Sequence, residues 1–285
     1  MAQEHGTPGT AGASQGSGTA RVLSPEVDVT VPSVARMYDY YLGGKDNYAV
    51  DRAAVAELDK MAPSTRPLAI NNRRFLQRAV RRLAEDHGIR QFLDHGSGLP
   101  TQDNVHQVAQ RVDPKSHVVY VDDDPIVLAH GRALLQEDDR TAVIQADMRD
   151  TDAIFDHPET RRLIDFSQPV AALFVSVMHC IPDPDPEQLL ERVVDRLPSG
   201  SFLVINQLVS EHQETRDFVT TFMNESTNDH WGRVREAHEV EKYFEGLEIL
   251  EPGLGEINDW RPDSDLGPKQ LTDEWYEFGG VARKP

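Results

Sequence analysis

The chain has 285 residues, of which 39% are hydrophobic, so it is long enough to bury one substantial core. Its formal net charge of −19 argues against nucleic acid or an anionic membrane as a partner, and no apolar run reaches the roughly 18–20 residues of a membrane span. The one cysteine, Cys180, excludes an intrachain disulfide and favours a reducing, cytoplasmic location.

Residues 1–32 are rich in Gly, Ser, Thr, Ala and Gln. Such a segment cannot bury enough apolar surface to offset the conformational entropy that ordering would cost. We therefore expect a disordered tail ahead of the folded part of the chain.

Residues 33–88 are expected to form a helical cap or lid. Ser33 is a favourable N-cap, Gly43 and Gly44 would end the first helix, and Asp46 can cap the second. The third helix repeats apolar residues at spacings of three, four and seven, which gives it one apolar face. The expected helices span residues 33–41, 48–61 and 64–86.

From residue 89 onward, strand-like and helical segments alternate. We expect strands at residues 91–95, 117–121, 142–145, 170–177 and 201–208. We expect helices between them at residues 103–111, 125–135, 150–164 and 186–197. This alternation predicts a doubly wound, Rossmann-like α/β fold with a mainly parallel sheet.

The C-terminal part differs from this pattern. After helices at residues 215–228 and 236–244, two β-like segments follow at residues 247–254 and 274–282. Because no long helix separates these two segments, they most simply form an antiparallel hairpin at the sheet edge.

A glycine loop follows the first expected strand. The apolar pair Phe92-Leu93 leads into Asp94 and then into Gly96-Ser97-Gly98. Glycine permits a tight turn and close approach of a ligand to the backbone, and ligands of α/β sheets bind at the carboxyl ends of the strands. A helix that begins near residues 101–104 would add free N–H groups for an anionic group.

Three acids, Asp94, Asp122 and Asp147, come directly after three successive strands. The carboxyl ends of parallel strands lie side by side, so these carboxylates are expected to converge on one crevice. Asp122 suits a ribose diol, Asp147 an exocyclic amine such as that of adenine, and Asp94 an ammonium group. Aspartates in such positions are also common helix caps and turn formers. Together with the glycine loop, the three acids favour a nucleoside cofactor.

The glycine spacing does not fit a dinucleotide. The G-x-G-x-x-G/A fingerprint would place a small residue at Thr101, which here follows Pro100. The chain also has no G-x-x-x-x-G-K-[ST] motif. An acid two residues before the first glycine makes little sense beside a pyrophosphate, but it suits the amino end of a methionine.

The segments LDHGSGLPT, VVYVDDDP and QADMRD resemble class I S-adenosylmethionine (SAM) dependent methyltransferases. More narrowly, SVARMYDYYLGGKDNYAVDRA, FLDHGSGLPTQDNVH and a late WRP resemble a bacterial S-adenosyl methyltransferase family formerly known as a domain of unknown function. The resemblance runs from about residue 33 to the end of the chain. It implies a seven-stranded sheet whose last two strands form the edge hairpin, and a SAM-binding domain over residues 89–285 that forms one unit with the cap.

The resemblance also implies cofactor contacts at Gly96, Gly98, Asp122 and Asp147. Neighbouring positions of the same loops and of the aromatic N-terminal segment extend the expected set. The full set of expected cofactor-binding residues is Tyr40, Gly44, Asp46, Asp94, Gly96, Ser97, Gly98, Asp122, Asp123, Asp147, Met148 and Ser176.

Methyl transfer needs a base only if the acceptor must lose a proton. His179 follows the fourth strand and is the candidate base, although a histidine at a strand end is more often a hydrogen-bonded rim residue. No Asn/Asp-Pro-Pro-aromatic sequence occurs there, which disfavours methylation of a nucleobase amine. The histidines show no paired metal-ligand spacing, so we expect no metal.

The sequence thus predicts a SAM-dependent methyltransferase that acts on a small molecule at O, N or C. Two alternatives stay open: a non-catalytic SAM-binding protein with a regulatory or partner-binding role, and an NAD-dependent oxidoreductase. The tyrosine-rich segment around Tyr40 is expected to fold over the crevice with Gly43-Gly44 as a hinge, or else to pack the cap onto the sheet. The acceptor and the oligomeric state are left open.

Overall fold

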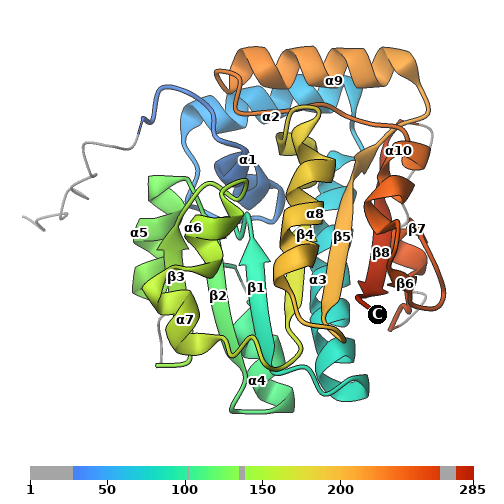
Figure 1. Ribbon diagram of the computed structural model, residues 1–285. Coiled ribbons are helices and arrows are strands. Elements are labelled where there is room, and N and C mark those ends of the chain that lie inside the picture. The colour runs from blue at the N-terminus through green and yellow to red at the C-terminus, as the bar shows by residue number, and fades with distance from the viewer. Residues whose placement is uncertain (1–27, 102, 135–138, 264–273) are drawn as a thin grey trace, which may run out of the picture.

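The computed structural model describes residues 28–101, 103–134, 139–263 and 274–285, and these contain one mixed sheet of eight strands. The strand order is β3-β2-β1-β4-β5-β8-β6, with the short β7 paired to β8 (Figure 1). The strands are β1 (Gln91–His95), β2 (His117–Asp122), β3 (Thr141–Gln145), β4 (Ala171–Val175), β5 (Phe202–Val209), β6 (Glu248–Ile249), β7 (Gly255–Glu256) and β8 (Tyr276–Arg283).

Strands β1 to β5 are parallel, and β8 runs antiparallel to β5. Almost every residue in these five strands is buried, as expected when helices cover both faces of a parallel sheet. The register pairs Asp94 with Tyr120 and Asp122 with Gln145, so the ends of β1, β2 and β3 lie in line. Because β8 is antiparallel to β5, its first residue, Tyr276, pairs with Val209 at the carboxyl end of β5.

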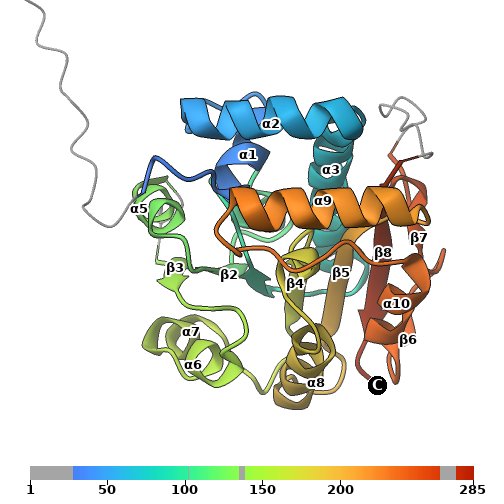
Figure 2. The ribbon, with the colours of Figure 1, turned by 90° about the horizontal axis from the view of Figure 1, so that it is seen from above.

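Helices cover both faces of the sheet (Figures 1 and 2). On one face, α3 (Thr65–Asp86), α4 (Val105–Val112) and α5 (Pro125–Leu134) enclose a core that includes Phe75, Leu83 and Trp260. On the other face lie α6 (Thr151–Phe155), α7 (Pro158–Leu163), α8 (Asp185–Arg196) and α10 (Ala237–Glu241). Short 3-10 turns are η1 (Met178–Cys180), η2 (Lys242–Phe244) and η3 (Ile257–Asp259).

A third layer lies over the carboxyl ends of the strands. It consists of α1 (Val34–Tyr41), α2 (Ala49–Met61) and α9 (Gln213–Ser226), which cross above the sheet in both views (Figures 1 and 2). These helices share a separate apolar cluster that includes Met37, Val55, Val219, Trp231 and Trp275. The cap is therefore assembled from both ends of the chain, because α9 joins two N-terminal helices.

The predicted α/β class, the mainly parallel sheet and the antiparallel C-terminal strands are confirmed, but the strand count of seven is wrong. The expected segment 247–254 is interrupted at Pro252-Gly253, where proline cannot donate a ladder hydrogen bond. Two short strands, β6 and β7, result, and both pair with β8.

Two local expectations are corrected as well. The helix expected at 150–164 is two helices, because Pro158 cannot sit in a helix interior and instead occupies the first turn of α7. Asp46 does not cap α2; Tyr48 holds the cap position, and its N–H donates to Asp51 Oδ2 at 2.7 Å. Residues 1–27 of the expected tail and Leu135 lie outside the described residues. None of the described helices is long and apolar enough to cross a membrane.

Candidate cofactor and acceptor site

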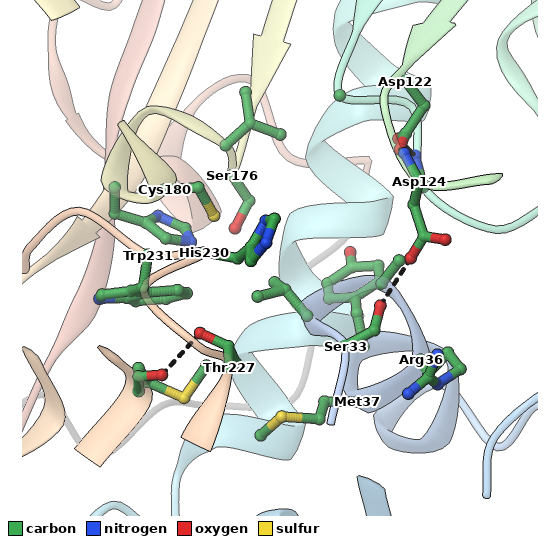
Figure 3. Close-up of a pocket in the computed structure, with 18 of the residues that line it drawn as sticks. Ser33, Arg36, Met37, Asp122, Asp124, Ser176, Cys180, Thr227, His230 and Trp231 are labelled. Atoms are coloured by element: carbon green, nitrogen blue, oxygen red, sulfur yellow. Dashed lines mark hydrogen bonds between the residues drawn. The ribbon is translucent and has the colours of Figure 1, made fainter. Parts of the chain in front are cut away.

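A cavity of about 710 Å³ lies between the strand ends and the cap. Ten of the thirteen residues that the sequence predicts for the site line it: Asp94, Gly96, Ser97, Gly98, Asp122, Asp123, Asp147, Met148, Ser176 and His179. In Figure 3, Asp122 and Asp124 lie across the cavity from Ser176, Cys180 and Trp231. We call the part lined by Asp94, Gly96, Gly98, Asp122 and Asp147 the β1–β3 side, and the part around Ser176 and Glu277 the β8 side.

The glycine loop turns as the sequence predicts. Gly96 and Gly98 have φ angles of +66° and +65°, a region that residues with a Cβ rarely adopt. The Gly96 and Ser97 N–H groups both donate to the carbonyl of Val121, which fixes the loop against the end of β2. A Cβ on Gly96 would lie 2.6 Å from Val177 Cγ1, whereas one on Gly98 would meet nothing within 4 Å. The backbone at Gly98 therefore leaves open space for a ligand.

Asp122, the last residue of β2, is hydrogen-bonded to the glycine loop. Its Oδ2 accepts from the Gly98 N–H at 2.8 Å and its Oδ1 from the Asp124 N–H at 3.0 Å. Asp124 in turn caps α5 through the Ile126 N–H at 2.9 Å and accepts from Ser33 Oγ at 2.8 Å (Figure 3). Burial raises the pKa of Asp122 to about 7, although the two backbone N–H groups oppose the shift.

Asp94 is 5% exposed at the end of β1. Burial raises its pKa to about 7; the nearby Arg73 guanidinium lowers the pKa and Asp122 raises it further. A carboxyl group in this state gains most from a cationic ligand, because the ligand offsets the cost of burying its charge.

Asp147 stands in a different environment at the end of β3. It is half-exposed, and both carboxylate oxygens accept from the Arg149 side chain at 2.6 to 3.0 Å. These hydrogen bonds hold the pKa of Asp147 below its usual value. Asp123 directly follows β2. Burial, followed by repulsion from Asp147, raises the pKa of Asp123.

Tyr40, Gly44 and Asp46 do not line the cavity. Their segment wraps the carboxylate of Asp39, which is 4% exposed and accepts from the Asp46 N–H at 2.9 Å. A Cβ on Gly44 would lie 1.9 Å from Asp39 Oδ1, so this position needs glycine for packing. Tyr40 is 37% exposed. Of the tyrosine-rich segment, Tyr38 and Tyr41 reach the cavity instead.

His179 lines the cavity but is held in the neutral form. Its Nδ1 accepts from the Leu208 N–H at 3.3 Å, and its ring lies 4.5 Å from the Trp231 ring. Burial, followed by the charge of Arg235, lowers its pKa to about 3. So weak a base accepts a proton poorly at neutral pH, which weighs against the predicted role of His179 in proton transfer.

The sequence interpretation missed a polar network on the β8 side. Glu277 is 2% exposed, and it accepts from Ser176 Oγ and, at 2.7 Å, from Asn206 Nδ2. Asn206 Nδ2 also donates to Asn72 Oδ1 at 2.9 Å. Asn72 Nδ2 donates to Tyr38 Oη at 2.9 Å, so the network reaches from the sheet to the cap. No local motif marks these residues, because they come from α1, α3, the loop after β4, β5 and β8.

Within the described ranges, no group of three or more His, Cys, Asp or Glu side chains is arranged to hold a metal ion. The lining of the cavity includes carboxylates, the glycine-loop backbone and aromatic rings, together with arginine, hydroxyl and amide side chains.

Comparison with known proteins identifies relatives of the whole folded region. The family model of S-adenosyl methyltransferases matches residues 20–285. A methyltransferase candidate from Thermobifida fusca YX is 41% identical, with a TM-score of 0.86 over 93% of this chain and 99% of that one. A DUF574 family protein from Streptomyces avermitilis MA-4680 is 38% identical, with a TM-score of 0.82 over 90% and 99% of the two chains. A search of curated proteins finds no match.

Proposed function

The chain belongs to the S-adenosyl methyltransferase family, and from this premise we propose which of its residues hold SAM and what class of acceptor it methylates. It is a SAM-dependent methyltransferase, so the NAD-dependent and non-catalytic alternatives are set aside. The assignment of individual residues, the acceptor class and the cellular location are our proposals.

The β1–β3 side has the chemistry that SAM requires. The strand order places Asp147, Asp122, the glycine loop and Ser176 in sequence along one edge, across four strands that are about 4.8 Å apart. That edge is about 14 Å long, which suits an adenine, a ribose and a methionine laid end to end. The open space over Gly98 and the unpartnered Ser97 Oγ, among the described residues, support a ligand against the loop.

Each group has one proposed role. Asp122 accepts from the ribose hydroxyls, and Asp94 binds the α-ammonium group of the methionine part. Asp147 and Asp123 contact the adenine edge, with Met148 packed beneath it, and Ser176 borders the methionine end. SAM supplies an electrophilic methyl group. The protein aligns the acceptor with that group and excludes water.

The acceptor is a small molecule in this proposal. A cavity of about 710 Å³ that also holds SAM has room for a compact second ligand. The free Cys180 supports a cytoplasmic location, and the two relatives, both from bacteria, support a bacterial origin.

The observation that carries the residue assignment is the convergence of Gly98, Asp94, Asp122 and Asp147 on one cavity. The test is a thermal-shift panel of SAM, S-adenosylhomocysteine (SAH) and NAD. A ligand at about 100 times its dissociation constant stabilises the folded state by about 2.7 kcal/mol. We expect SAM and SAH to raise Tm by several degrees and NAD to leave it unchanged. Loss of the SAH shift in Asp94→Asn and Asp122→Asn, with its retention in the surface variant Asp152→Asn, is the expected pattern. Equal shifts in all three variants would contradict the assignment.

A further inference from the structure

Among the described residues, Glu277 is the one carboxyl group of the β8 side that lines the cavity and is almost fully buried. Its two oxygens each accept one hydrogen bond, from Ser176 Oγ and from Asn206 Nδ2. Ser176 reaches it from a left-handed backbone conformation, with φ at +58°, which a serine adopts only at a cost in free energy. The strained backbone of Ser176 therefore accompanies a hydrogen bond that holds the Glu277 carboxyl group.

No cation of the described residues pairs with Glu277. The arginines of the described residues that line the cavity have other partners. Arg36 pairs with Asp51 at 2.9 Å, Arg73 donates to Asp103 O and Asn104 Oδ1 at 3.1 Å, and Arg149 pairs with Asp147 at 2.6 Å. The titratable neighbours influenced by Glu277 are Tyr38 on α1 and Cys180 on η1; burial raises the pKa of both, so both are uncharged. A buried carboxylate without a cation is costly, and a cationic ligand would remove that cost.

The surroundings suit a cation with an organic body. Trp275, directly before β8, is two positions from Glu277, and Trp231 and Tyr38 line the same cavity. Aromatic faces attract ammonium groups and also pack against apolar carbon. The lining is rich in carboxyl groups as a whole, which favours cationic over anionic acceptors.

We propose that Glu277 binds the ammonium group of an amine acceptor beside the transferred methyl group and takes its proton, so that the enzyme is an N-methyltransferase. The proposal rests on the proposed function, because it places the methionine end of SAM next to Ser176, the hydrogen-bond partner of Glu277. The described geometry places no other carboxyl group in direct hydrogen-bond contact with Ser176.

The chemical step balances. The ammonium group transfers one proton to the Glu277 carboxylate, and the freed nitrogen lone pair forms a bond to the methyl carbon. The methyl–sulfur bond breaks, and its electron pair stays on sulfur, which yields SAH and a methylammonium product. Glu277 then releases its proton to solvent. Its pKa, which burial raises to about 7, is suited to accepting and releasing a proton near neutral pH.

The test uses sinefungin, a SAM analogue that carries C–NH₃⁺ where SAM carries S⁺–CH₃, and compares it with SAH, which lacks that group. Isothermal titration measures both affinities in wild type, Glu277→Gln and the control Glu256→Gln, whose carboxyl lies outside the cavity lining. We expect a sinefungin preference of roughly 10- to 100-fold in wild type and in the control, and its loss in Glu277→Gln. SAH affinity should stay within about twofold in all three proteins.

The pH dependence gives a second readout. The sinefungin preference should rise as pH increases through about 7 in wild type, because only the Glu277 carboxylate attracts the ammonium group, and it should be flat in Glu277→Gln. Taking the ratio to SAH cancels the titration of Asp94 and Asp122, which contact the parts that both ligands share. Ser176→Gly relieves the strained φ and removes one donor, so the rise should move to higher pH.

Each outcome has a separate meaning. If SAH does not bind wild type, the proposed function fails. If SAH binds but the sinefungin preference is the same in Glu277→Gln, the role of Glu277 is refuted. An equal loss of SAH and sinefungin affinity in Glu277→Gln would also overturn it, because Glu277 would then bind the α-ammonium group shared by both.

Discussion

The β1–β3 side of the cavity takes its residues from the ends of three consecutive strands and from the loops that follow them. The residues of the β8 side instead come from five separate parts of the chain. Residues 94–147 form one continuous stretch of sequence in which each acid lies at the end of its own strand or just beyond it. Tyr38, Asn72 and Glu277 meet only because the cap crosses the strand ends and β8 runs antiparallel. The first side should therefore respond to mutation mainly in cofactor affinity, and the second mainly in stability and acceptor chemistry.

The largest expected effect is on the β1–β3 side. Asp122→Asn should weaken SAH binding by about 100-fold, or about 3 kcal/mol. The Asp122 carboxylate accepts from two backbone N–H groups and, in the proposed binding mode, from ribose, and an amide cannot replace all of these contacts. Isothermal titration checks this, with the exposed Asp152→Asn as the control. Unchanged affinity would remove Asp122 from the ribose site.

Gly96→Ala and Gly98→Ala separate packing from conformational strain. Both positions have positive φ, which costs about 1–2 kcal/mol with a Cβ. Only Gly96→Ala also forces a Cβ to within 2.6 Å of Val177 Cγ1, so we expect it to destabilise the fold by about 3 kcal/mol and Gly98→Ala by about 1 kcal/mol. Urea denaturation measures both values. Gly98→Ala should nevertheless lose SAH affinity, and equal stability losses would show that the Val177 contact is readily relieved.

Asn206→Ala tests the β8 side. The side chain is fully buried, and its Nδ2 donates to Asn72 and Glu277, so its removal should cost about 2 kcal/mol of unfolding free energy. SAH affinity should change by less than about threefold, in contrast to Asp122→Asn. Asn258→Ala, at a partly exposed site outside the cavity lining, is the control and should cost less than about 0.5 kcal/mol. A large loss of SAH affinity in Asn206→Ala would mean that the two sides are not separable.

Carboxyl groups on both sides of the cavity should make the stability of the folded protein depend on pH. Asp94, Asp122 and Glu277 each have a pKa raised to about 7 by burial. Burial favours their protonated forms in the folded protein without ligand. Their contribution to the free energy of unfolding is therefore fully present below about pH 4 and is lost as pH rises through about 7. Glu239, whose pKa is lowered to about 2 chiefly by the Arg233 hydrogen bond, titrates below this range.

SAM binding should show the opposite trend, because the cationic ligand needs the carboxylates. The SAM-induced increase in Tm should be larger at pH 8 than at pH 6, and Asp94→Asn should reduce that difference. Thermal shift across this range checks the sign. A larger increase at pH 6 would contradict the proposed contact between Asp94 and the ammonium group.

The smallest expected effect is at Asp147. Because this carboxylate is half-exposed and already held by Arg149, Asp147→Asn should weaken SAH binding only about fivefold, or about 1 kcal/mol, and change stability by less than about 0.5 kcal/mol. Titration of SAH measures the change, with Arg161→Gln on α7 as an exposed control. A loss as large as that of Asp122→Asn would mean that adenine contributes as much as ribose.

The sequence by itself determined the α/β class, the mainly parallel character of the sheet and the cofactor. These features are encoded locally: β1 begins and ends at the predicted residues, and its glycines adopt the predicted turn. Sequence reasoning assigned Gly44 and Asp46 to the cofactor, but in the structure their segment encloses Asp39, which no pattern of residue types reveals. A carboxylate and the groups that enclose it leave no periodic signal.

Only the tertiary structure decided the composition of the β8 side. Glu277 lies far along the chain from Asn72, and it enters the cavity because β8 is inserted between β5 and β6 in antiparallel direction. That insertion depends on pairing between segments that are distant in the sequence. The strands β6 and β7, which also pair with β8, have only two residues each and leave little signal in the sequence. Local backbone conformation is enough to form the glycine loop. The Glu277 carboxyl group, in contrast, acquires its hydrogen-bond partners and its raised pKa only when distant strands and the cap have packed together and buried it.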